Sequence, residues 1–259
     1  SLLMTFTFKR LTFFALLAIL FFANQSCNKN DINASSDSKT RGGLALTFDD
    51  NYIDNWYRNL DLFDSLGVKA TFYISNYNKL NAAQKIKLQE IKNHGHEIAF
   101  HSTNHVNFLK CVDSTSVDKL VKREIDHGLK LLNNDGFYPT TFAYPYGQHN
   151  DFLDQLLLKR FKSVRALNGT QDLSRSLVPL KNNKLLFGLG IDESSNRNLS
   201  KIEDLLYLAQ QTNRCAVLLV HNIERHDMKM QIPLWKLREI LIRAKSLNLK
   251  FYTISEISK

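Results

Sequence analysis

The chain has 259 residues, of which 44% are hydrophobic and 11% aromatic, so it is too apolar for a disordered protein and can bury one sizeable core. Ten glycines and four prolines exclude a collagen-like or low-complexity chain. The 34 Lys and Arg residues outnumber the 25 Asp and Glu residues, and the formal net charge of +9 raises the question of a polyanionic partner such as nucleic acid.

Residues 1–26 have the pattern of a signal peptide. Lys9 and Arg10 precede a thirteen-residue run from Leu11 to Ala23 with a single polar residue, which is shorter than the roughly 20 apolar residues that cross a bilayer. Cys27 follows, with Ser26 before it, and this arrangement resembles the lipobox of bacterial lipoproteins, whose cysteine is lipidated. We expect an exported protein held at a membrane only by a lipid on Cys27. An ordinary signal peptide cut nearby is the alternative.

A polar segment separates this signal from the rest of the chain. Residues 27–40 are rich in Asn, Ser and Asp and predict a flexible tether, after which residues 41–259 form one domain. Residues 1–26 hold two basic and no acidic residues, so their removal lowers the net charge to +7. The remaining basic residues are scattered, without a run of five, and they do not predict a nucleic-acid partner.

Short apolar runs alternate with amphipathic segments throughout the domain. Apolar residues at helical spacing occur from Val117 to Leu132 and from Leu234 to Ala244. Such alternation indicates parallel strands joined by helices, and eight candidate strands favour a closed or nearly closed α/β barrel. In such barrels the chemistry lies at the C-terminal ends of the strands. The candidate strands are Gly43–Phe48, Ala70–Ser75, Glu97–Phe100, Thr140–Tyr144, Ser163–Leu167, Leu185–Ile191, Ala216–His221 and Lys250–Ile254.

Two adjacent carboxylates, Asp49 and Asp50, end the first candidate strand. Neighbouring like charges are costly to bury together unless a cation or a proton-transfer role compensates. One aspartate can ligate a metal while the other handles the proton of a water molecule. The structural alternative is a helix N-cap, because a helical pattern follows Asp50.

Histidines follow the third candidate strand at a spacing of four, at His101 and His105. On one helical turn they would face the same way, and two imidazoles with a carboxylate from elsewhere form a common catalytic zinc site. Chance surface pairs are the alternative. His94 and His96 flank a turn glycine before the strand, and we interpret them as structural or solvent-facing.

Two further strand ends carry candidate groups. Pro145 and Gly147 predict a stiff turn that exposes the backbone N–H of Tyr146 as an oxyanion donor, unless it is an ordinary turn. His221 ends an apolar strand, where it can protonate a leaving group or be a core histidine bonded to a carbonyl.

Together these segments resemble the polysaccharide deacetylase (NodB-homology) family, carbohydrate esterase family four, over about residues 43–254. The resemblance implies a distorted, TIM-like (β/α) barrel of seven to eight strands and a metal-dependent hydrolase that deacetylates N-acetylated sugars or acetylated xylan. The matching segments are, in order, Thr47–Asp50, Gly95–Ile98 running into His101–His105, Tyr144–Gly147 and Leu218–His221.

The resemblance also implies roles for individual residues. Asp50, His101 and His105 would hold a divalent metal, with zinc expected first and cobalt or nickel as alternatives. Asp49 would be the general base, His221 the general acid, and the Tyr146 backbone N–H an oxyanion donor. Leu219 would line the pocket of the acetyl methyl group, and Pro145 and Tyr146 would also contact substrate.

The sequence departs from the family pattern near the third and fourth motifs. Ala143 stands where many members have an arginine that orients the base, Asn51 stands where glycine is frequent, and the acidic, Trp-containing fourth motif is not evident. We hypothesise that Arg165, in the next candidate strand, supplies the missing guanidinium to Asp49.

The expected partner is an acetylated polysaccharide or oligosaccharide, and the function is release of acetate from its N-acetyl or O-acetyl groups. A glycan-binding relative with weakened catalysis is one alternative, although both aspartates and all three histidines are present. An amidase acting on a small non-sugar amide is the other, and exposed aromatics such as Trp56 or Trp235 in a shallow groove would argue against it.

Overall fold

The computed structural model describes residues 42–112, 116–225 and 229–259. The predicted signal peptide, Cys27 and the predicted tether lie outside the described residues. Among the residues that are described, no helix is long and apolar enough to cross a membrane.

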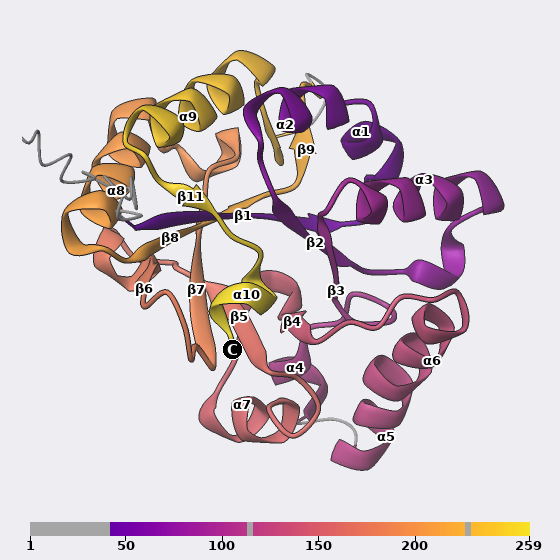
Figure 1. Cartoon of the computed structure of the whole chain (residues 1–259). Helices are drawn as coiled ribbons and strands as arrows, with labels where there is room; N and C mark the ends of the chain where they lie inside the picture. The colour runs from indigo at the N-terminus through magenta and orange to yellow at the C-terminus, as the bar shows by residue number, and fades with distance from the viewer. Residues whose placement is uncertain (1–41, 113–115, 226–228) are drawn as a thin grey trace, which may run out of the picture. The chain divides into compact units, whose positions relative to one another are not determined.

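Seven parallel strands close into a barrel, as predicted (Figure 1). The ring closes because β1 pairs with β2 on one edge and with β8 on the other. In ring order the strands are β1 (Gly43–Asp50), β2 (Ala70–Ile74), β3 (Glu97–Phe100), β4 (Thr141–Ala143), β5 (Ser163–Leu167), β7 (Leu185–Gly190) and β8 (Cys215–Val220).

The eighth predicted strand forms outside the ring. β11 (Lys250–Phe251) pairs in parallel with Gly43 and Leu44 of β1, just before the residues of β1 that pair with β2. β6 (Leu177–Val178) pairs antiparallel to β8. A two-stranded sheet of β9 (Asn222–Ile223) and β10 (Gln231–Ile232) follows β8.

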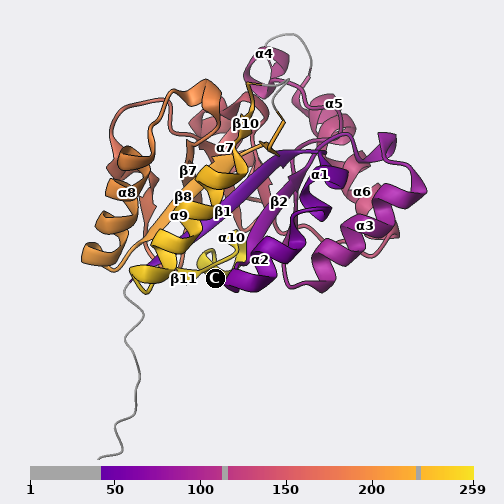
Figure 2. The ribbon, with the colours of Figure 1, turned by 90° about the horizontal axis from the view of Figure 1, so that it is seen from above.

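Helices surround the ring and cover its outer surface (Figures 1 and 2). They include α1 (Ile53–Tyr57), α2 (Leu60–Leu66), α3 (Ala82–Asn93), α4 (Phe108–Val112), α5 (Val117–Val121), α6 (His127–Asn134), α7 (Asp151–Leu157), α8 (Leu199–Thr212) and α9 (Leu234–Ser246). Helix α10 (Ile254–Ile257) contributes Ile254 and Ile257 to the apolar cluster that fills the barrel interior.

The two-residue period of the strands divides the core in two. In β1, Leu44, Leu46 and Phe48 belong to the large cluster that includes the helices, whereas Ala45 belongs to the small interior cluster. Asp49 lies four residues after Ala45, so its side chain is on the same face of the strand, and it is 3% exposed. The alternation of side chains that builds the core therefore also places the carboxylate of Asp49, the last inward-facing residue of β1, in the barrel interior.

Candidate active site

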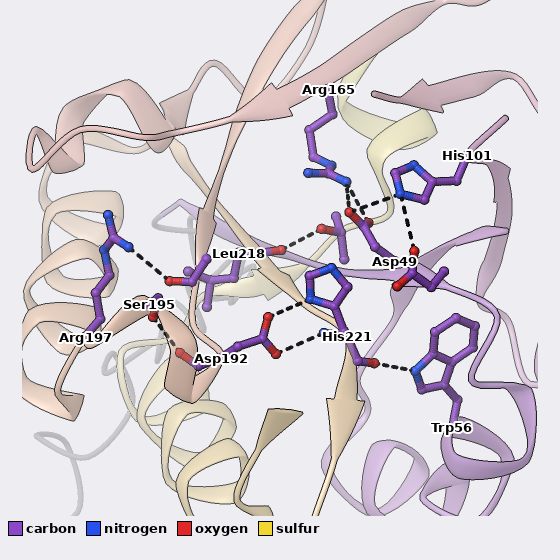
Figure 3. A network of polar contacts seen from close by, with 12 residues as sticks. Asp49, Trp56, His101, Arg165, Asp192, Ser195, Arg197, Leu218 and His221 are labelled. Atoms are coloured by element: carbon purple, nitrogen blue, oxygen red, sulfur yellow. Dashed lines mark hydrogen bonds and ion pairs between the residues drawn. The ribbon is translucent and has the colours of Figure 1, made fainter. Parts of the chain in front are cut away.

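The candidate groups meet at the C-terminal end of the barrel. Asp49 and Asp50 end β1, His101 follows β3, Arg165 lies in β5 and His221 follows β8. Figure 3 shows Arg165 and His101 pointing toward Asp49, with His221 between Asp192 and Trp56. Residues distant in sequence converge because parallel strands all end at the same edge of the ring.

Asp50, His101 and His105 form a cluster that could hold a metal ion. One ligand atom from each lies within 4.8 Å of the others. Nε2 of His105 is 3.1 Å and Nε2 of His101 is 3.7 Å from Oδ1 of Asp50. That oxygen is buried without a well-formed hydrogen bond in the described residues. One carboxylate oxygen and two imidazole nitrogens with an open side fit zinc and similar divalent ions.

His101 is fixed in the form that binds a metal. Its Nδ1–H donates to the backbone carbonyl of Ala143 at 2.8 Å, which leaves the Nε2 lone pair directed at the aspartates. Burial lowers the pKa of His101 to about 4, so the ring is neutral at pH 7. Ala143 therefore contributes a carbonyl to the site.

A loop, and not the helical turn we expected, brings the two histidines together. Ser102 and His105 both have positive φ, 66° and 55°. The ring centroids of His101 and His105 lie 4.9 Å apart. Non-glycine residues adopt this backbone conformation only where the surroundings enforce it. The spacing of four was therefore correct about proximity and wrong about its local cause.

Glu124 enforces that loop conformation, and sequence reasoning missed it. Its fully buried carboxylate accepts the backbone N–H of Asn104 at 3.0 Å and the Asn104 side-chain amide at 3.1 Å. Its backbone carbonyl accepts both the N–H and the hydroxyl of Thr103 at 3.0 Å. No sequence signal indicated this role, because a glutamate within an amphipathic helical pattern is usually a solvent-exposed residue.

Arg165 contacts Asp49 as the hypothesis requires. Nη2 of Arg165 lies 2.6 Å from Oδ1 and 2.5 Å from Oδ2 of Asp49, and the arginine is fully buried. Its guanidinium lies over the Tyr73 ring at 5.1 Å. Gly188 makes room for it, since a Cβ there would lie 3.3 Å from Nη1 of Arg165. The charged pair is buried beside the possible metal ligands, because Oδ2 of Asp49 lies 3.8 Å from Nε2 of His101.

Asp192 is a second residue that sequence reasoning missed. Its Oδ2 lies 2.6 Å from Nδ1 of His221, and its Oδ1 accepts the His221 backbone N–H at 3.1 Å. Burial by itself would lower the pKa of His221, but the hydrogen bond and charge of Asp192, together with the charges of Asp49 and Asp50, outweigh burial and raise it. An aspartate just beyond the predicted strand ending at Ile191 was the available signal.

The third motif forms a tight turn beside the cluster. Tyr146 has φ 63° and is 60% exposed, and its ring centroid is 4.8 Å from that of His105. Gly147 is required there, because φ is 66° and a Cβ would lie 2.2 Å from Cβ of Leu167. Pro145 is the buried residue of the turn. Leu219, in β8, is 5% exposed.

The two tryptophans differ in exposure. Trp56 is fully buried, and its Nε1–H donates to the backbone carbonyl of His221 at 2.7 Å, so it supports the site from below and presents no sugar-binding surface. Trp235 is 60% exposed.

Comparison with known proteins finds similarity to deacetylases of polysaccharides. Residues 36–160 match the family model described as polysaccharide deacetylase, a range that includes Asp49, Asp50, His101, His105 and Tyr146. A probable peptidoglycan-N-acetylglucosamine deacetylase of Arthroderma benhamiae is 29% identical over 119 residues, which is 45% of this chain. The match spans only 26% of that relative's length.

Solved structures share the fold at low identity. The Xyl-CE4 domain of a multidomain xylanase from the hindgut metagenome of Trinervitermes trinervoides has a TM-score of 0.57 and 20% identity, covering 83% of this chain and 89% of that domain. The peptidoglycan deacetylase PdaC of Bacillus subtilis has a TM-score of 0.56 and 21% identity, with coverage of 83% and 89%. At such identities the likeness shows the fold.

Proposed function

We propose that this chain, whose residues 36–160 match the polysaccharide deacetylase family model, removes acetyl groups from a polysaccharide by hydrolysis. One observation carries the proposal. The Arg165-bound carboxylate of Asp49 and the Asp192-bound imidazole of His221 lie beside one cluster of possible metal ligands. A base, an acid and an electrophile site are the three components that amide or ester hydrolysis needs.

The chain's own residues divide the proton transfers between them. Asp49, held by Arg165, accepts the proton of the attacking water. His221 has Nδ1 engaged by Asp192, so its Nε2–H is the proton available for the leaving nitrogen or oxygen. The raised pKa of His221 favours the protonated ring to a higher pH than in an ordinary histidine. The backbone N–H of Tyr146 donates to the oxygen that becomes negative.

A divalent metal, zinc first among the candidates, would be held by Asp50, His101 and His105. When bound, it would polarise the acetyl carbonyl and favour ionisation of water at neutral pH. His101 is suited to bind this metal, because its ring is neutral and its orientation is fixed by the hydrogen bond to the carbonyl of Ala143.

The substrate we favour is an N-acetylated glycan of the peptidoglycan or chitin type, the classes named by the relatives that match this chain. The exposed ring of Tyr146 beside His105 offers a sugar-stacking surface at the cluster. In this proposal Leu219 lines the acetyl methyl pocket, and Pro145 shapes the turn that contacts the sugar.

The two alternatives are less well supported. A weakened glycan-binding relative would not need Asp49, His221 and their partners held in charged pairs. A small-amide hydrolase is disfavoured by the exposed ring of Tyr146 beside His105, whereas Trp56 contributes nothing to this argument because it is buried.

We also propose that the enzyme is exported and held at a membrane by a lipid on Cys27, with no nucleic-acid partner. The apolar run before Cys27 and the deacetylase site support this location, because acetylated wall glycans lie outside the cytoplasm. Metabolic labelling with a radioactive fatty acid tests it, and unlabelled protein, or label retained by Cys27→Ala, would contradict it.

Acetate release from chitooligosaccharides, peptidoglycan, acetylxylan and poly-N-acetylglucosamine tests the proposed activity and selects the substrate. A chelator should abolish release, and zinc or cobalt should restore it. Asp49→Asn should keep metal affinity and lose turnover, whereas His101→Ala should lose both. Equal loss of metal in the two variants would refute the division of roles, and full activity of metal-free protein would refute the mechanism.

A further inference from the structure

Although the basic residues are scattered along the sequence, seven of them lie at the end of the barrel opposite the active site. Five of the eight parallel strands begin with a cation at or just before their first residue. These are Lys69 before β2, Lys162 before β5, Lys184 before β7, Arg214 before β8 and Lys250 at the start of β11. All five side chains belong to exposed residues.

Helix ends extend this surface. Lys92 and Lys245 lie in the last turns of α3 and α9, which return to the same end of the barrel. Lys69 and Lys92 line one shallow cavity of about 320 Å³, and Lys69, Lys245 and Lys250 line another of about 380 Å³. We call these seven residues the basic end: Lys69, Lys92, Lys162, Lys184, Arg214, Lys245 and Lys250.

Among the described residues, few carboxylates neutralise the basic end. Glu97 lines the cavity of Lys69 and Lys92, but its two oxygens accept the hydroxyls of Thr71 and Thr141. Glu256 is 4.0 Å from Lys69, and Asp64 is already paired with His94 at 2.7 Å. Lys162, Lys184 and Arg214 form no ion pair with any residue that the structure describes. Seven exposed cations on one surface repel one another and destabilise the fold slightly, so an anionic partner is the natural counterpart.

The chain enters the domain at this same end. Gly42 and Gly43 precede and begin β1, and Figure 2 places β11, α10 and the labelled C-terminus at this end, with α4 and β10 at the other. About fifteen residues separate Gly42 from Cys27, and a chain of that length reaches roughly 50 Å even when fully extended. A lipid on Cys27 would therefore keep the domain within roughly 50 Å of the membrane.

We propose that the basic end docks on the anionic phospholipid headgroups of the membrane that carries the anchor, which turns the active site away from the bilayer and toward the glycan. The inference rests on the proposed anchor. Each Lys or Arg near an anionic surface strengthens binding roughly fivefold. The attraction acts within a Debye length of about 8 Å at physiological salt, so the charges of the basic end, and not the connection to Gly42 alone, would set the orientation of the domain.

The test measures partition of the full chain into vesicles of phosphatidylcholine with or without phosphatidylglycerol, as the ratio of the two partition constants. Using the ratio cancels any contribution of the apolar run, which inserts into both lipids. The basic-end variant is Lys162→Glu, Lys184→Glu, Arg214→Glu. The matched control, Lys119→Glu, Lys201→Glu, Arg238→Glu, changes the net charge equally at exposed residues that form no ion pair elsewhere on the described surface.

The wild-type ratio should exceed about ten at low salt and fall toward one in 0.5 M salt. The basic-end variant should have a ratio at least fivefold below that of the wild type, and the control should keep most of the wild-type value. An equal fall of the ratio in both variants would mean that the overall charge of the protein, and not the basic end, determines binding to anionic vesicles. Binding of inorganic polyphosphate is measured for the same proteins. If the basic-end variant lost polyphosphate binding but kept the wild-type vesicle ratio, the surface would bind a soluble polyanion and not the membrane. Acetate release in detergent separates failure of this inference from failure of the proposed activity, since both variants leave the active site intact.

Discussion

At the scale of single residues, Asp192 determines how His221 can act. Both oxygens of Asp192 contact His221, one at the ring and one at the backbone N–H. The raised pKa of His221 keeps the ring protonated to higher pH than an ordinary histidine. A step that needs the protonated ring is therefore active below that pKa and is lost as pH rises through it.

We predict that Asp192→Asn moves the descending limb of the pH–turnover profile to lower pH. Removing the charge removes the interaction that opposes burial, so His221 loses its proton earlier. Turnover should drop by on the order of tenfold more at pH 8 than at pH 6. Glu193→Gln is the matched control, because it removes a neighbouring charge that contacts Gln231 and not His221. Superimposable profiles for Asp192→Asn and wild type would contradict the assignment.

Arg165 carries a second prediction at this scale. Removing one partner of a buried charged pair destabilises a protein by about 3–5 kcal/mol, because the other charge is left unpaired. Arg165→Ala should lower the free energy of unfolding by about that amount and turnover by on the order of 100-fold.

Arg165→Lys separates positioning from folding. It keeps the positive charge but not the planar guanidinium, so it should recover most of the stability and only part of the turnover. Denaturant unfolding and acetate release measure the two quantities. Unchanged turnover in a folded Arg165→Ala protein would show that Asp49 needs no guanidinium.

At the scale of elements, a π-helical turn positions the histidine loop. The pattern from Val117 to Leu132 predicts continuous helix, and the structure has α5, a π-helical turn at Lys122–Asp126, and α6. The wider turn carries Glu124 to the loop backbone. Gly128 lets α6 approach, because a Cβ there would lie 2.5 Å from the hydroxyl of Thr103.

Glu124→Gln should lower zinc affinity by about 10- to 100-fold, because the amide cannot accept from both Asn104 donors and the loop loses its fixed conformation. A competition assay with a chromogenic chelator measures the affinity directly. Asp126→Asn, on the same turn but paired at the surface with Arg160, should change it little. A similar loss in both variants would indicate general damage to the helix.

At the scale of the whole molecule, the three ligands come from β1 and from the loop after β3, so a bound metal links segments that separate on unfolding. A ligand at 100 times its Kd that binds only the folded state adds about 2.7 kcal/mol. For a domain of this size that corresponds to a rise in Tm of roughly 5–10 °C.

Zinc should therefore raise the Tm by that amount, and a chelator should reverse the rise. Scanning calorimetry of wild type and His105→Ala tests this, because the variant lacks one ligand and should show little change. An equal rise in both proteins would place the stabilising metal elsewhere.

The sequence by itself determined the alternation of strands and helices, the barrel and the strand ends at which Asp49, Asp50, His101, His105 and His221 lie. Periodicity encodes these features locally, since apolar runs fix the strands and parallel strands share one edge. Tertiary structure decided the rest. The pairing of Asp192 with His221 and the support of the histidine loop by Glu124 join residues far apart in sequence. The contact of Arg165 with Asp49 followed from the family arginine that is absent at Ala143, and not from any local pattern. No local pattern records which buried charges meet, because that depends on how seven strands close into one ring.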